Sequence, residues 1–255
     1  MININKRRIL ERACITRYQP YSLEGEEKMK RKSAIDDFMK LKLISDPQPS
    51  PDGMSITYCV KRVVEEKNIY RSSIWSVSYK GGMPRCMTAE EFSANNPRWS
   101  PDGKFIAFLS DRQKPKDQIY LLPADGGEAS ALTNLEEEGS ISGLRWSPNG
   151  SHIAFLYRKT PEQWTEKAKK ERTEKGISSP VRLHKSLHYR MDGAGYTDDE
   201  YPQIWVVDVK TGEARQLTVG DASCQMPVWM NDSDALAFLS DRSDDRDITA
   251  SHPSL

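Results

Sequence analysis

The chain has 255 residues, of which 37% are apolar and 29% are charged, and its mean hydropathy is -0.70. Basic and acidic residues balance at 37 each, which excludes the strongly basic surface typical of nucleic-acid-binding proteins. No apolar run is long enough to cross a bilayer as a helix. The composition predicts a water-soluble protein with a modest core and many polar turns.

The first residues, "MININKRRILERACI", carry positive charge but no continuous apolar segment comes after them, so we identify no secretory signal. We interpret residues 1–32 as a disordered or mis-assigned extension, with Met29 as an alternative to Met1 for the natural start. Cysteines stand far apart with no Cys-x-x-Cys pair, at Cys14, Cys59, Cys86 and Cys224. This spacing favours free thiols in a reducing cytoplasm over a disulfide framework.

A repeated pattern runs through most of the sequence. Pro-Asp-Gly or Pro-Asn-Gly turns occur at 51–53, 101–103 and 148–150, and a degenerate copy lies within 229–241. Each turn is followed by a short run rich in β-branched and aromatic residues, as in "SITYCV", "FIAFLS", "HIAFLY" and "ALAFLS". Short runs of this kind, bounded by turn residues, predict β-strands.

Two further strands follow in each complete copy, and a tryptophan strand leads into the next turn in three of four copies. The first of these two further strands ends in a glycine-containing turn. The second ends on a threonine, which is Thr88, Thr133 or Thr218. Ile74 and Ile119 are separated by the same interval as Thr88 and Thr133. Four strands in a period of roughly 40–50 residues are typical of a β-propeller blade.

The pattern therefore predicts an all-β fold: an incomplete β-propeller of about three and a half four-stranded blades built from WD40-like or SPDG repeats. A short N-terminal helix and one helical insertion complete the expected fold. The propeller part is expected over 33–255, and its units are expected at about 44–88, 92–133, 140–218 and, incomplete, 222–255.

The insertion is expected at 157–202, within the third unit. Its first part, "TPEQWTEKAKKERTEKG", predicts a helix with Thr160 as N-cap, Pro161 at the first helical position and Gln163 completing a capping box. Gly176 is expected to end the helix. A nearly all-polar helix is either a solvated strut or a partner-binding arm, and the sequence leaves both open.

Two candidate sites follow the helix. His184 and His188 have the spacing of metal ligands on a helix, but no matching Cys or carboxylate accompanies them, so we assign no metal. Asp198, Asp199 and Glu200 form an acidic patch that is either a solvated loop or a substrate-binding site for a cation such as a peptide amino terminus.

No set of catalytic residues is recognisable in the sequence. The glycines of "GSISG" flank Ile141 rather than a serine, so a nucleophile elbow is missing. There is no P-loop, no dinucleotide fingerprint and no zinc-ligand set. We therefore assign no catalytic residue, no cofactor and no metal.

The repeats, the charged helical insertion, "YRMDGAGYTDDEYPQIWVVDVKTGEARQLT" and the final "FLSDRSDD" resemble the N-terminal propeller of acylaminoacyl-peptidase-type enzymes. These enzymes belong to the prolyl oligopeptidase family (S9) of serine peptidases. The resemblance covers about residues 33–248. It implies a propeller that gates and positions short peptides for an α/β-hydrolase domain carrying Ser, Asp and His.

This chain is expected to lack the hydrolase domain, so the resemblance predicts a truncated, cytoplasmic peptidase propeller without activity by itself. Two alternatives remain: a stand-alone binding propeller of the TolB type, and an interaction module completed by dimerisation or by a second chain. The expected partners are short peptides, reached through the missing catalytic domain, and a second copy or a complementing half-propeller. Neither nucleic acid nor a membrane is expected as a partner.

Overall fold

The computed structural model describes residues 32, 34–113, 117–184, 187, 189–192, 195–196 and 200–243. The chain divides after Ile35 into two units, and the second unit, which begins at Asp36, contains all the strands. A 3-10 helix, η2 (Ile35–Lys40), precedes the first strand. It is the short N-terminal helix that the sequence predicts.

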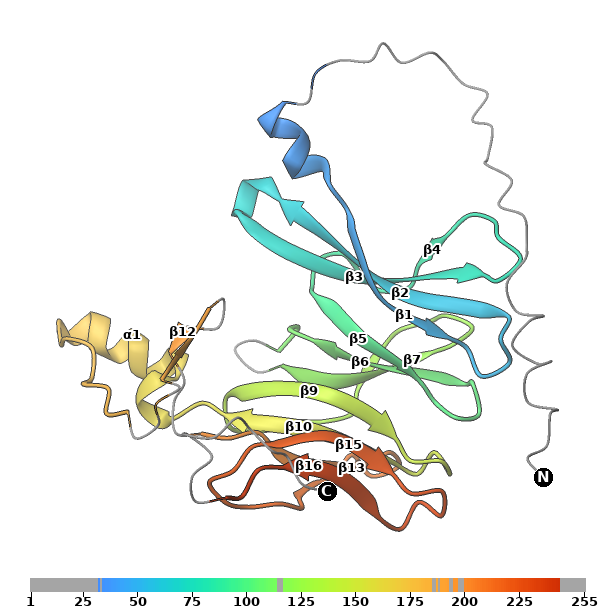
Figure 1. The fold of residues 1–255 in the computed structure, drawn as a ribbon. Helices are drawn as coiled ribbons and strands as arrows, with labels where there is room; N and C mark the ends of the chain where they lie inside the picture. The colour runs from blue at the N-terminus through green and yellow to red at the C-terminus, as the bar shows by residue number, and fades with distance from the viewer. Residues whose placement is uncertain are drawn as a thin grey trace, which may run out of the picture. The chain divides into compact units, whose positions relative to one another are not determined.

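Three four-stranded antiparallel sheets succeed one another along the chain (Figure 1). The first contains β1 (Leu43–Pro49), β2 (Ser55–Val64), β3 (Ile69–Ser78) and β4 (Arg85–Cys86). The second contains β5 (Ala94–Trp99), β6 (Phe105–Ser110), β7 (Gln118–Pro123) and β8 (Ser130–Ala131). The third contains β9 (Gly139–Trp146), β10 (His152–Lys159), β13 (Gln203–Asp208) and β14 (Ala214–Gln216).

A fourth sheet pairs β15 (Cys224–Trp229) with β16 (Leu236–Ser240). In each four-stranded sheet the strands pair in the order in which they occur along the chain. The first strands β1, β5, β9 and β15 contact one another in series, so successive sheets meet along these strands. The all-β, propeller-type fold predicted from the repeats is confirmed.

The remaining elements are short. The 3-10 helix η3 (Glu65–Lys67) links β2 to β3. The insertion between β10 and β13 contains η4 (Glu162–Trp164), α1 (Glu166–Lys175), β11 (Arg190–Met191) and β12 (Gly195–Tyr196). The predicted start of this insertion at 157 is too early, because β10 continues to Lys159 and Tyr157 pairs with Gln203.

The helix in the insertion also begins later than the sequence predicts. Thr165 rather than Thr160 is the N-cap, and its side chain accepts a hydrogen bond from the amide of Ala168. Pro161 and Gln163 precede α1 and contribute only to the 3-10 turn that leads into it. Gly176 ends the helix in the left-handed conformation, at a φ of 63°. No residue of α1 is buried.

The hydrophobic core lies between neighbouring sheets. Phe108 of β6 is fully buried in a cluster that joins the first sheet to the second, and Phe155 of β10 is fully buried in a cluster that joins the second to the third. Fully burying a side chain of this size stabilises a fold by about 1.5–3 kcal/mol. Because each core is shared by two sheets, every blade depends on its neighbour.

Two features of the repeat hold each blade in register. Gly53, Gly103 and Gly150 adopt φ values of 70°, 72° and 73° at the turn between the first two strands. Their left-handed conformation is the role expected from the Pro-Asp-Gly pattern. The threonine that closes each repeat accepts a hydrogen bond from the third strand, as in Thr133 Oγ1 with the amide of Ile119 at 3.0 Å.

Candidate functional site

The turns that follow β1, β5 and β9 share one hydrogen-bonding pattern. In the second sheet, the hydroxyl of Ser100 donates to Asp102 at 2.7 Å and accepts from the amide of Phe105 at 2.9 Å. Asp102 also accepts from the amide of Lys104 at 3.1 Å. These bonds, led by that from Ser100, lower the pKa of Asp102 below its usual value. The aspartate of the repeat thus stabilises a turn and is not available for chemistry.

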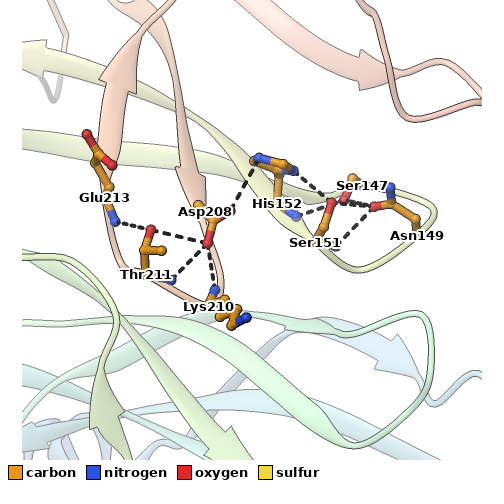
Figure 2. Close-up of polar contacts among 8 residues, drawn as sticks. All are labelled: Ser147, Asn149, Ser151, His152, Asp208, Lys210, Thr211 and Glu213. Carbon is orange, nitrogen blue, oxygen red and sulfur yellow. Dashed lines mark hydrogen bonds and ion pairs between the residues drawn. The ribbon is translucent and has the colours of Figure 1, made fainter.

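In the third sheet the equivalent turn lies beside a serine, a histidine and an aspartate (Figure 2). Ser151 Oγ lies 2.7 Å from Nδ1 of His152, and Nε2 of His152 lies 3.7 Å from Oδ2 of Asp208. The cluster is not evident from the sequence because Asp208 comes from β13, beyond the insertion. A Ser-His pair after a Pro-Asn-Gly turn was the only signal in the sequence.

This cluster does not have the geometry of a catalytic triad. A triad needs a serine hydroxyl that donates to one ring nitrogen while the other ring N–H donates to a carboxylate. Here Ser151 Oγ also lies 2.7 Å from Oδ1 of Asn149, which competes for its single proton. The 3.7 Å between His152 and Asp208 exceeds a hydrogen bond and leaves an electrostatic contact when the histidine is protonated.

Asp208 is committed to its own turn. Its Oδ1 accepts from the amides of Lys210 and Thr211, both at 2.8 Å, and from the Thr211 hydroxyl at 3.2 Å (Figure 2). The bond from the Thr211 amide is the largest cause of the lowered pKa of Asp208. We therefore interpret the Ser151–His152–Asp208 cluster as two turns held together, not as a catalytic centre.

A groove of about 1120 Å³ lies beside the insertion and includes Glu200. It is lined by the acidic run Glu136, Glu137 and Glu138, by the end of β10, and by η4 and α1. Glu137 forms an ion pair with Lys159 at 2.6 Å, and the Glu138 carboxylate accepts from the amide of Glu166 at the start of α1. The bond from Glu166 connects the start of α1 to the segment that leads into β9, and the ion pair connects that segment to β10.

Of the predicted acidic patch, only Glu200 lies within the described residues; Asp198 and Asp199 lie outside them. Glu200 is exposed on the groove, where Glu136 and Glu162 also lie. Within the described part of the chain, no hydrogen bond or ion pair engages these three carboxylates. The groove thus brings Glu200 together with acidic residues that are distant from it in sequence.

His188 also lies outside the described residues. The ring of His184 stacks on Tyr196, with ring centroids 5.6 Å apart and an interplanar angle of 18°. Arg182 covers the ring of Trp164, with 3.7 Å between its guanidinium carbon and the ring centroid. No group of metal-binding side chains is found among the residues that the structure describes. His184 therefore has an aromatic packing role in the insertion.

A second polar arrangement lies along the first strands of the sheets. Arg98 of β5 donates to both carboxylate oxygens of Asp46 on β1, at 3.0 and 2.8 Å. The side chains of the pair are only 19% and 26% exposed. Arg145 of β9 occupies the corresponding position of the next sheet, directly before the tryptophan, and within the described residues it donates to the carbonyl of Leu144 and to no carboxylate. The sequence analysis missed both arginines, although "PRW" and "LRW" repeat the pattern.

Three of the cysteines lie in the described part of the chain, and all three are free: Cys59, Cys86 and Cys224. Burial raises the pKa of Cys59 to about 11, so its thiol is unreactive at neutral pH. None of the helices described in the structure could span a membrane.

Comparison with known proteins gives one curated relative and several solved structures. The chain is 34% identical over 224 residues to the uncharacterized peptidase YuxL of Bacillus subtilis (strain 168), a match that covers 88% of this chain and 33% of that protein. The chain thus spans about a third of the length of this relative. No family model matches the chain.

The solved structures share the fold at low sequence identity. The acylaminoacyl peptidase of Pyrococcus horikoshii superposes with a TM-score of 0.60 at 20% identity, over 81% of this chain and 29% of that chain. An oligogalacturonate lyase in complex with manganese superposes with a TM-score of 0.51 at 16% identity, over 80% of this chain and 48% of that chain.

The sheets and these comparisons define the class of protein: the chain has a propeller-type fold similar to that of peptidases and a lyase. Its curated sequence relative is a peptidase, and the acylaminoacyl peptidase superposes with a higher TM-score than the lyase. The chain therefore has the fold of the propeller region of acylaminoacyl peptidase, and its sequence is similar to part of a peptidase, in agreement with the resemblance that the sequence predicts.

Proposed function

We propose that this chain is the part of a serine peptidase that admits and positions short peptides for a separate hydrolase domain. The observation that carries the proposal is the 34% identity with a peptidase, which extends over 224 residues and includes most of this chain. A propeller without a nucleophile serves such an enzyme by limiting access and by contacting the substrate.

The proposal includes the absence of peptide hydrolysis by this chain alone. Among the described residues, the nearest approach to a nucleophile, a base and an orienting acid is Ser151, His152 and Asp208, whose contacts are those of turns. An assay of the purified chain with acyl-peptide and aminoacyl chromogenic substrates tests this. We expect no turnover above that of heat-inactivated protein, and turnover sensitive to serine-directed inhibitors would refute the proposal.

We further propose that the groove beside α1 binds the cationic end of a substrate. Six glutamates and four lysines line the groove, so its carboxylates, which include Glu200, Glu136 and Glu162, are in excess and can attract an ammonium group over the range of a Debye length, about 8–10 Å at ordinary salt. Glu200→Gln should weaken binding of a peptide with a free amino terminus and leave its N-acetylated form unaffected. Equal binding of the two peptides to the unmodified protein would exclude this site.

An interaction module is a second candidate, supported by the edge of the fourth sheet. Among the described residues β16 pairs only with β15, whereas β2, β6 and β10 each pair with strands on both sides. A cavity of about 410 Å³ beside β16 is lined by apolar side chains that include Leu217, Trp229 and Phe238. A strand that pairs on one side alone can pair with a strand of another chain on its other side. Light scattering on the purified chain distinguishes a dimer or larger assembly from a well-folded monomer, which would exclude this candidate.

A further inference from the structure

The first strands of the four sheets share a backbone pattern, although the residues at the equivalent positions differ. Each has a left-handed residue at the same place, followed by two positions and then by the tryptophan position. The left-handed residues are Asp46, Asn96, Gly143 and Met226, with φ values of 50°, 57°, 65° and 49°. At each of them the strand pairing is interrupted by a bulge or irregularity. Equivalent side chains on β1, β5, β9 and β15 can therefore be compared directly.

Between the first and second sheets, this register holds a complete ion pair. Asp46 accepts from Gln48 of its own strand at 2.8 Å and from Arg98 of the next sheet at 2.8 Å. The left-handed position thus supplies a carboxylate, and the position before the tryptophan of the following sheet supplies a guanidinium.

Between the second and third sheets, the carboxylate is replaced by an amide. Asn96 occupies the place of Asp46, and Arg145 occupies the place of Arg98. The Oδ1 atom of Asn96 is buried and accepts no hydrogen bond within the described part of the chain. Arg145 donates from Nη1 to the carbonyl of Leu144 and is exposed to solvent. Arg145 therefore lacks the carboxylate partner that Arg98 has.

The charges in this region add up to an excess of one positive charge. Partial burial is the first cause that lowers the pKa of Arg145, and the nearby Arg98 guanidinium is the second, while Asp46 acts in the opposite direction. Arg98 and Arg145 lie on the contacting strands β5 and β9, and within the described residues the Asp46 carboxylate pairs with Arg98 and not with Arg145. The next sheet adds no charge, because Gly143 and Val228 stand at the corresponding places.

The main chain holds both arginines in place. The indole nitrogen of Trp146 donates to the carbonyl of Arg98 at 3.0 Å, and that of Trp229 donates to the carbonyl of Arg145 at 2.9 Å. A fixed backbone limits the region that each guanidinium can reach, and the planar donors of a guanidinium match a carboxylate.

We infer that Arg145, with Arg98 beside it, forms a binding site for a carboxylate group on the first strands of the second and third sheets. The ligand carboxylate binds the Arg145 guanidinium as the Asp46 carboxylate binds that of Arg98 one sheet earlier. A peptide α-carboxylate and an acidic side chain share this chemistry. The site does not depend on the proposed peptidase role, because binding can be measured with this chain alone.

Isothermal titration of the full chain at low ionic strength tests the inference with three probes. N-acetyl-trialanine carries a free α-carboxylate, its C-terminal amide carries none, and N-acetyl-aspartic acid α-amide carries only a side-chain carboxylate. We expect at least one carboxylate probe to bind and the trialanine amide not to bind. The two acidic probes distinguish the source of the carboxylate, and added salt should weaken binding.

Two variants locate the site. Arg145→Met should weaken binding of the carboxylate probe at least about tenfold, since charge-assisted hydrogen bonds are lost. Asn96→Asp adds the missing carboxylate in a left-handed position that Asp46 already tolerates, so it should also reduce binding at least about tenfold while raising the urea midpoint. Arg158→Met, which removes an exposed arginine from β10 of the third sheet, is the matched control and should bind as the unmodified protein does.

The inference is wrong if the unmodified protein binds neither acidic probe, or if it binds the trialanine amide equally well. It is also wrong if either Arg145→Met or Asn96→Asp retains full affinity. Because Asn96→Asp adds a partner to the fold, its loss of binding cannot be ascribed to unfolding when its urea midpoint is unchanged or raised.

Discussion

The indole nitrogen of Trp146 donates a hydrogen bond to the main-chain oxygen of Arg98, 3.0 Å away in the preceding sheet. Trp99 and Trp229 make the same bond to the sheets before theirs, at 3.3 and 2.9 Å. The repeated tryptophan therefore connects successive sheets through its N–H as well as through its ring. The strand order of the fold makes each of these bonds an inter-blade contact.

Replacing Trp146 with Phe keeps an aromatic ring and removes the donor. The carbonyl of Arg98 then loses its partner, and we expect the free energy of unfolding to fall by about 1 kcal/mol more than in the control. Trp205→Phe is the control, since Trp205 packs in the same sheet and no hydrogen bond from its indole is among the described contacts. Urea denaturation measures both, and equal losses would show that the N–H contributes nothing.

The repeated threonines should differ in importance. Thr133 is buried, accepts from the amide of Ile119 and donates to Gln118 at 2.6 Å, whereas Thr88 accepts from the amide of Ile74 at 3.0 Å. Thr133→Val leaves buried polar groups without partners and should cost about 2–3 kcal/mol, against about 1–2 kcal/mol for Thr88→Val. Chemical denaturation of the two variants tests the order, and a larger loss for Thr88→Val would contradict it.

Substitutions at the left-handed position of the first strands should change the free energy of unfolding in opposite directions. Met226 is 62% exposed and adopts a φ of 49° that a methionine rarely takes. Met226→Asn should raise the unfolding free energy by about 0.5–1 kcal/mol, because asparagine tolerates this conformation. Gly143→Ala should lower it by about 1 kcal/mol, since Gly143 has a φ of 65°. Thermal and urea unfolding should both show a more stable Met226→Asn and a less stable Gly143→Ala. A change of stability in the same direction for both variants would contradict the role of the left-handed conformation.

Most of the blade could be predicted from the sequence because its signals are local. A Pro-Asp-Gly turn, a closing threonine and a tryptophan before the turn each specify a nearby backbone conformation or a repeated contact. The left-handed position was missed for the opposite reason. The same left-handed conformation is adopted by four chemically different residues, so no residue type marks it in the sequence: Asp46, Asn96, Gly143 and Met226.

Contacts between segments that are distant in the chain also could not be predicted from the sequence. The position of Asp208 beside His152 depends on strand pairing across the insertion, and the Glu200 groove depends on the path of that insertion. The cap of α1 was assigned to Thr160 because Pro161 and Gln163 fit the usual pattern. A 3-10 turn instead uses those residues and moves the helix start to Thr165.

Protonation of the turn aspartates should contribute to the loss of folding stability at low pH. The pKa of Asp102 in the folded protein lies below its usual value of 3.8, first because Ser100 donates to it. Its contribution to stability is therefore present above the unfolded-state pKa and is lost as the pH falls through the lower folded-state pKa.

Asp102→Asn should reduce this loss below about pH 4, because asparagine keeps the turn without titrating, as Asn149 does in the third sheet. Urea midpoints of both proteins at a series of pH values measure the difference. Ser100→Ala removes the hydroxyl donor and should also weaken the pH dependence. Identical pH profiles for the unmodified protein and Asp102→Asn would contradict the assignment.

We propose that this chain positions peptides and does not hydrolyse them by itself. Labelling of the purified chain with a fluorophosphonate, followed by intact mass measurement, tests it most directly because the reagent modifies activated serines. The account predicts no stoichiometric adduct, including at Ser151, and the same spectrum for Ser151→Ala. A one-to-one adduct on the unmodified protein that disappears in Ser151→Ala would contradict it.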